Sequence, residues 1–159
     1  MNITHGIDGF VVREMNRRCN YDRFMLTTAL MDIENYLGEV IQVSKADYSD
    51  FVSLRLAEQI ADGTVDMRLI ANEKLVELHG LIIDSLLHKP FPLICIHDEF
   101  KASPVNMNYV RQHYIDIFAE LSLSNILSDI LTEVNGMPNP ISKFGKIDHL
   151  IRQSNYALS

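Results

Sequence analysis

Hydrophobic residues recur along most of the chain at intervals of three and four, the period of an amphipathic α-helix. The clearest stripe runs from Leu26 to Ile41, and Asn20 or Asp22 precedes it as a candidate N-cap. Further helices are predicted over residues 44–63, 64–90, 103–121 and 124–136, and shorter ones over 8–18 and around 147–151. The pattern therefore predicts an all-α fold, a compact bundle of about six or seven helices.

One stretch departs from helical spacing. Prolines flank and interrupt the apolar run at residues 90–96, and side chains alternate from Leu93 to His97 as in an extended chain. A second weak alternation covers residues 39–43, and a ribbon of two such strands is marginal unless helices cover it. We therefore predict an extended, buried connector near residues 91–97 within the helical bundle.

Length and composition are those of one ordinary globular domain. The chain has 159 residues, 47% of them hydrophobic and 22% charged, and no long linker divides it, so residues 1–159 are predicted to form a single helical domain. Its two cysteines, Cys19 and Cys95, have no C-x-x-C spacing and suit a reducing compartment. We expect a cytoplasmic protein without a membrane segment, because neither a signal-like start nor a run of ~20 apolar residues is found.

The negative charge is concentrated in the middle third of the chain. Residues 32–84 contain eleven acidic and four basic residues, which accounts for the formal net charge of −7. A field of this sign repels phosphate backbones, so direct binding to nucleic acid is disfavoured. No glycine-rich phosphate loop or other cofactor motif occurs, so no cofactor is predicted.

An acidic helical surface is suited to docking a basic surface of another protein, because complementary fields speed encounter and exclude wrong partners. The leading hypothesis is therefore a non-catalytic protein-binding module, such as an inhibitor, an immunity or antitoxin-like protein, or an adaptor or chaperone. The predicted partner-binding residues are acidic side chains of the middle third: Asp47, Asp50, Glu58, Asp62, Asp66, Glu73, Glu77 and Asp84.

A metal-dependent hydrolase of HD-like type is an alternative hypothesis. The pair His97-Asp98 matches the dipeptide of HD-type phosphohydrolases, although two prolines precede it and its segment does not have helical spacing. The remaining ligands of such a site would be an upstream histidine and a downstream aspartate. The candidates are His79 or His88, and Asp116 or Asp129.

Two other patterns place candidate ligands together. Asp84 and His88 are four residues apart on one predicted helix, and His113, Asp116 and Glu120 are three or four apart on another, so each set shares a helical face. In the extended segment, Cys95, His97 and Glu99 alternate to one side, the arrangement of a thiol nucleophile with its base. The sequence leaves two metal-binding sets open. One consists of His97, Asp98 and Glu99, and the other of His113, Asp116 and Glu120.

A third hypothesis is a self-associating structural component or homodimer. It depends on a group of flexible and aromatic apolar residues near the N-terminus, which would form an adaptable patch. The group consists of Met15, Tyr21, Phe24, Met25 and Met31.

Overall fold

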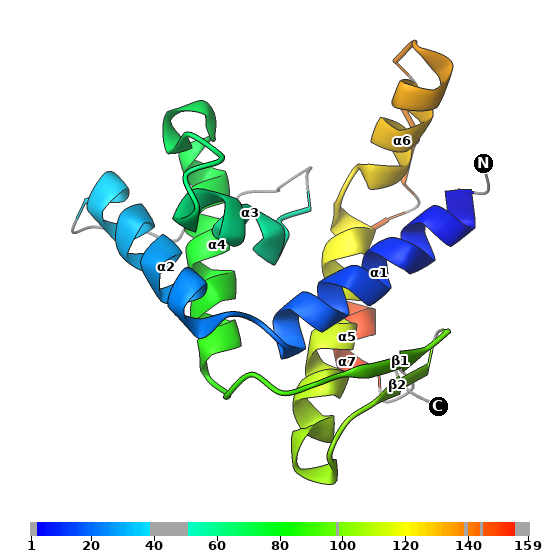
Figure 1. Cartoon of the computed structure of the whole chain (residues 1–159). Helices are drawn as coiled ribbons and strands as arrows, with labels where there is room; N and C mark the ends of the chain where they lie inside the picture. The colour runs from blue at the N-terminus through cyan, green and yellow to red at the C-terminus, as the bar shows by residue number, and fades with distance from the viewer. Residues whose placement is uncertain (1–2, 39–50, 98, 139, 144, 155–159) are drawn as a thin grey trace.

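The computed structural model of the protein describes residues 3–38, 51–97, 99–138, 140–143 and 145–154. Over these residues it contains seven α-helices, two short 3-10 helices and one two-stranded hairpin, so the predicted all-α bundle is confirmed. The helices form two groups (Figure 1). The first contains α2 (Arg23–Leu37), α3 (Leu54–Ala61) and α4 (Asn72–Leu86), and the second contains α1 (Ile3–Cys19), α5 (Met107–Leu123), α6 (Ile126–Asn135), α7 (Asp148–Gln153) and the hairpin.

The first group encloses an apolar core. The side chain of Asp22 caps α2 by accepting from the backbone N–H groups of Phe24 and Met25, and Gly38 ends the helix at a φ of 78°. Because α2, α3 and α4 each turn one apolar stripe inward, their buried side chains meet between the three helices. We call this set the apolar core: Leu26, Ala29, Ile33, Leu54, Ala57, Leu75, Leu78 and Ile82.

Two helix boundaries in this group differ from the prediction. Helix α3 begins at Leu54, where Ser53 is the N-cap and accepts from the N–H of Arg55, whereas the helix was predicted to start at residue 44, which lies outside the described residues. The single helix predicted from Thr64 to Pro90 is two elements, because Asp66 caps a short 3-10 helix, η1 (Met67–Leu69), and the chain is extended at Ile70 before α4.

The hairpin belongs to the second group. Strand β1 (Ile94–Ile96) pairs antiparallel with β2 (Glu99–Lys101), and the turn between them holds His97 at a φ of 55°. The connector is extended as predicted, but its burial ends early: Phe91 is buried, whereas Ile94 and Ile96 are 59% and 47% exposed. The reason is that one face of this ribbon packs on the protein and the other faces solvent. The predicted strand at 39–43 lies outside the described residues.

The second core lies between α1, α5 and the hairpin. It contains Val11, Met15, Cys19, Phe91, Phe100, Val110 and Ile117. The N–H of Phe91 donates to the carbonyl of Cys19 over 2.8 Å, which ties the connector to the end of α1. The predicted start signal at Ser103-Pro104 opens a 3-10 turn, η2 (Pro104–Asn106), that leads directly into α5.

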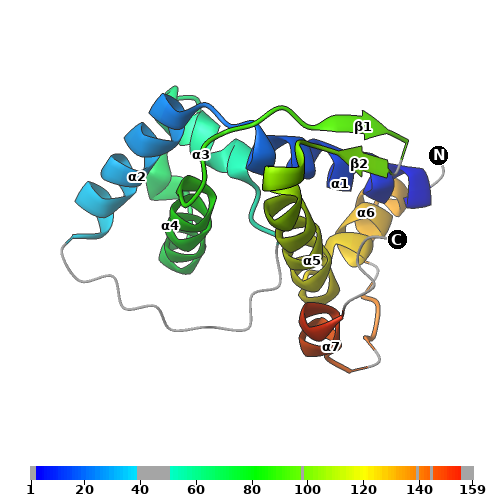
Figure 2. The ribbon, with the colours of Figure 1, turned by 90° about the horizontal axis from the view of Figure 1, so that it is seen from below.

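The C-terminal helices are attached to α5. Nζ of Lys143 donates to the carbonyls of Ser122 and Leu123 over 3.2 and 2.5 Å and so satisfies the end of α5. Helix α6 ends at Gly136 in the left-handed conformation, as predicted, and α7 packs along α5 (Figure 2). Within the described part of the chain, no helix has the length and apolar character needed to cross a membrane.

Candidate functional site

A buried ion network joins the two groups of helices. Arg18, on α1, donates from Nε to Oε1 of Glu14 over 3.2 Å and from both terminal nitrogens to Glu120 of α5, over 3.2 and 2.6 Å. Glu14 in turn accepts from Oγ of Ser53 over 2.5 Å and from the N–H of Leu54 over 3.0 Å, at the start of α3. Glu14 and Arg18 are almost fully buried, so one salt-bridged network holds α1, α3 and α5 together.

Burial and charge act against each other in this network. Burial favours the neutral form of Arg18, but the ion pairs and hydrogen bonds with Glu120 and Glu14 outweigh it, so its pKa is raised and it stays charged. Burial raises the pKa of Glu120, and the attraction of Arg18 offsets only part of this effect. Arg17 also pairs with Glu14 across 3.7 Å, so the two carboxylates of the network face two guanidinium groups.

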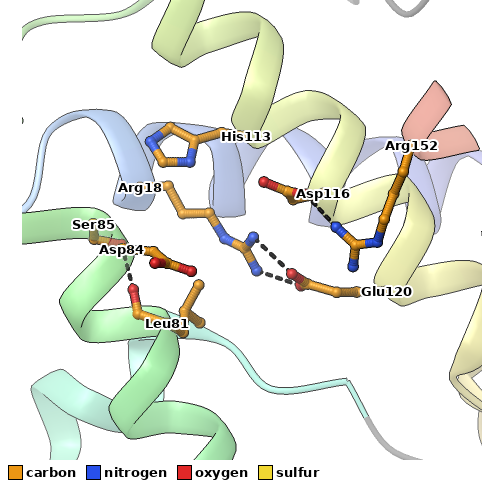
Figure 3. A pocket seen from close by; sticks show the side chains of 8 residues that line it. All are labelled: Arg18, Leu81, Asp84, Ser85, His113, Asp116, Glu120 and Arg152. Atoms are coloured by element: carbon orange, nitrogen blue, oxygen red, sulfur yellow. Dashed lines mark hydrogen bonds and ion pairs between the residues drawn. The ribbon is translucent and has the colours of Figure 1, made fainter. Parts of the chain in front are cut away.

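A polar pocket of about 350 Å³ lies where α1, α4, α5 and α7 meet (Figure 3). Two guanidinium groups line it, and each already has a carboxylate partner: Arg18 is paired with Glu120, and Arg152 with Asp116. Burial, and then repulsion by Asp116, raise the pKa of Asp84. The lining residues are Arg18, Leu81, Asp84, Ser85, His113, Asp116, Glu120 and Arg152.

Glu77 extends the negative charge along α4. It lies two turns before Asp84, and its Oε2 is buried without a hydrogen-bond partner among the described residues. Burial, and then repulsion by Glu120, raise the pKa of Glu77 to about 7. We call the pocket together with this carboxylate the acidic cleft: Glu77 and Asp84 on α4, and Asp116 and Glu120 on α5.

Two buried histidines lie beside the cleft. Nε2 of His88 and Nε2 of His113 are 2.8 Å apart, and Nδ1 of His88 is 2.9 Å from the carbonyl of Lys89. A carbonyl only accepts, so Nδ1 of His88 carries its proton, and in the neutral pair His113 donates to His88. Burial lowers the pKa of His113 to about 3, which keeps its ring neutral. The hydroxyl of Tyr21 donates to the carbonyl of His88 and links this pair to the start of α2.

The predicted partner-binding residues occupy several places. Glu77 and Asp84 belong to the acidic cleft, whereas Glu58, Asp62, Asp66 and Glu73 lie on α3, on the turn that follows it, at η1 and at the start of α4. Asp62 accepts from the N–H of Thr64, and Asp66 pairs with Arg68. Asp47 and Asp50 lie outside the described residues.

The candidate metal ligands are partly brought together. The histidine–carboxylate sets of the two helices meet at the cleft, because His88 contacts His113 and the pKa of Asp84 responds to the charge of Asp116. His97 is exposed at the hairpin turn, and Asp98 lies outside the described residues. Within the parts of the chain that the structure describes, no three His, Cys, Asp or Glu side chains are arranged to hold a metal ion.

The two thiols are not activated nucleophiles. Burial raises the pKa of Cys19 to about 12, and burial also raises the pKa of Cys95 above its ordinary value. A reactive thiol requires the opposite shift.

In the proposed self-association patch, Met15 and Tyr21 are core residues, whereas Phe24 and Met31 are exposed on α2.

The sequence interpretation missed the most buried charges. It singled out neither Arg18 nor Glu14, and both are inside the protein. Their spacing of four residues on one helix was the available signal, and it does not distinguish a buried pair from an exposed one. The sequence matches neither a protein-family model nor a curated protein.

Proposed function

We propose that the protein is a non-catalytic binding module that docks a basic segment of a partner protein in the acidic cleft. The observation that carries the proposal is a shortage of positive charge between α4 and α5. Both guanidinium groups of the pocket already have carboxylate partners, yet Oε2 of Glu77 is buried without a hydrogen-bond partner among the described residues, and burial and neighbouring carboxylates raise the pKa of both Glu77 and Asp84. An incoming cation would supply the missing charge.

The chemistry favours a lysine or arginine side chain as the inserted group. A cation between Asp84 and Asp116 would relieve the repulsion that raises the pKa of Asp84, and it would gain charge-assisted hydrogen bonds in a partly desolvated site. The net charge of −7 would speed the encounter with a basic surface. Inhibitors of basic proteins, immunity or antitoxin-like proteins, and adaptors or chaperones bind in this way, and the proposal covers these classes together.

A labelled octa-arginine peptide tests the proposal by fluorescence anisotropy at about 50 and about 300 mM salt, which changes the screening length more than twofold. We expect binding at low salt that weakens strongly at high salt. The double variant Glu77→Gln, Asp84→Asn should weaken binding at low salt about tenfold, which corresponds to ~1.4 kcal/mol. The matched control Asp32→Asn, Glu99→Gln removes two carboxylates from α2 and the hairpin and should weaken binding less than twofold.

Equal weakening in both double variants would show that only the total charge matters and would remove the cleft from the proposal. Binding that does not respond to salt, or no binding to the unmodified protein at low salt, would refute the proposal itself.

A further inference from the structure

Helix α6 has an apolar face that the described part of the protein covers only in part: Ile126, Ile130 and Leu131 are half-buried. Its side chains Leu127 and Val134 are 40% and 58% exposed, as is Met137 just beyond its end, at 68%, and none of its residues is buried. Figure 1 shows α6 extending beyond the end of α5, away from the apolar core. The apolar residues of the helix share one side at helical spacing. They are Ile126, Leu127, Ile130, Leu131 and Val134.

The contrast with α3 shows what is missing. Helix α3 is even shorter, with eight residues against ten, but it buries Leu54, Ala57 and Ile60 against α2 and α4. Isolated helices shorter than about 12 residues are marginal in water, and most helical stability in proteins comes from packing an amphipathic face. Helix α6 has such a face, but none of its side chains is fully buried.

Charge indicates what would cover this face. From Ser124 to Ser142 the chain contains two acids and no lysine or arginine. These acids, Asp129 and Glu133, are four residues apart and border one edge of the apolar face. A second copy would add its own Asp129 and Glu133 and no basic residue from this segment to pair with them, between two chains of net charge −7. An amphipathic helix with basic flanks would instead pair its cations with them.

We infer that α6 is a second contact surface, which packs against a basic amphipathic helix of the partner protein. The apolar face supplies contact area. Asp129 and Glu133 favour a helix with basic residues beside its apolar face. The inference rests on the proposed function in one respect, namely that the partner is basic. It adds that the partner presents a helix and that apolar burial on α6 contributes to its affinity.

The test uses a labelled peptide of about 18 leucine and lysine residues with one apolar face, and a scrambled peptide of the same composition without such a face. We expect the unmodified protein to bind the amphipathic peptide at least tenfold more tightly than the scrambled one. The variant Leu127→Gln, Val134→Gln should lose most of this preference. The matched control Leu69→Gln, Val105→Gln changes the same residue types at positions that are 86% and 79% exposed elsewhere, and should keep it.

A second variant protects the test against simple loss of α6. The variant Asp129→Lys, Glu133→Lys leaves the apolar face intact. It should weaken binding of the amphipathic peptide about tenfold, while the circular dichroism spectrum stays unchanged. An equal effect of the α6 and control variants, or an absence of any preference for the amphipathic peptide, would overturn the inference. So would a dimer in sedimentation equilibrium that Leu127→Gln, Val134→Gln dissociates, because the occupant would then be a second copy.

Octa-arginine separates this inference from the proposed function. If the α6 variants no longer bind the amphipathic peptide but still bind octa-arginine, the two surfaces act separately and both proposals stand. If octa-arginine fails to bind the unmodified protein while the amphipathic peptide binds through α6, the acidic cleft fails as a site and α6 remains one. If the cleft variant abolishes binding of both peptides and the α6 variants affect neither, only the inference on α6 fails.

Discussion

The apolar core and the boundary between the two groups of helices are built from different chemistry. The apolar core between α2, α3 and α4 is a cluster of aliphatic side chains, with Tyr21 packed at it. The boundary between this group and the second group instead contains the network of Glu14, Arg18 and Glu120, and the pair of His88 and His113. Apolar packing is non-directional and stabilises many arrangements, whereas buried charges are tolerated only where their partners meet them. The apolar core therefore accounts for stability within one group, and the polar boundary determines how the two groups sit against each other.

The largest predicted effect is the removal of the cation at this boundary. Arg18→Met keeps a long apolar side chain but leaves Glu14 and Glu120 without their shared partner, so we expect a loss of about 3–5 kcal/mol in the free energy of unfolding. Urea denaturation at pH 7.5 measures it. The control Arg68→Met breaks the exposed pair with Asp66 and should leave the urea midpoint unchanged. A loss below about 1 kcal/mol for Arg18→Met would mean that the network does not support the boundary.

A truncation in the apolar core should cost nearly as much but behave differently with pH. Leu78→Ala removes a fully buried side chain between α2, α3 and α4, for which about 2–4 kcal/mol is expected. Tyr21, the ionisable side chain packed at the apolar core, has a pKa that burial raises above its usual 10, so the loss should be equal at pH 5 and pH 8. Chemical denaturation at both values measures it. A loss that changes by more than about 1 kcal/mol between them would show that the apolar core and the boundary are coupled.

The histidine pair gives a smaller effect that depends on pH. His113→Leu leaves Nε2 of His88 unpaired in a buried position, so we expect a loss of about 1–3 kcal/mol at pH 7.5. In the folded protein the pKa of His113 is about 3, below its usual 6.5, so the unfolded chain binds the extra proton between these values. The contribution of His113 to the free energy of unfolding is therefore fully present above pH 6.5, and it is lost as the pH falls toward 3.

The cost of His113→Leu should consequently shrink by about 2 kcal/mol between pH 7.5 and pH 5, because the leucine variant has no such proton to bind. Thermal or urea unfolding across this range provides the measurement. A cost that is the same at both pH values would show that the ring of His113 titrates normally in the folded protein.

The apolar periodicity predicted the parts of the fold that depend on local chemistry. The sequence offered Asn20 or Asp22 as the cap of α2, and Asp22 is the cap; Gly136 ends α6 where the sequence indicated. At Ser103-Pro104 the chain enters a 3-10 turn, and α5 begins only at Met107. The acidic cleft was only partly predictable. Asp84 and Asp116 were recognised on separate helices, but their meeting depends on how α4 and α5 pack, and a helical spacing contains no information about that. The burial of Arg18 could not be predicted either, because the spacing of residues on α1 does not show which helix packs against that face.

The smallest predicted effect concerns Glu77, the carboxylate at the edge of the boundary. Its pKa in the folded protein is about 7, above the usual 4.5, because it is partly buried and faces Glu120, with Lys74 and Arg18 as opposing charges. The folded state holds this proton more tightly than the unfolded chain, so its stabilising contribution is complete below pH 4.5 and is lost as the pH rises through 7. Glu77→Gln should thus be close to neutral at pH 5 and stabilise the protein at pH 8. We expect a gain on the order of 1 kcal/mol, reduced from the full value by the partial exposure of the side chain. Glu99→Gln on the exposed hairpin is the matched control for the loss of one carboxylate. If Glu77→Gln has equal effects at pH 5 and pH 8, the carboxylate carries no excess of repulsion, and the acidic cleft does not lack a cation.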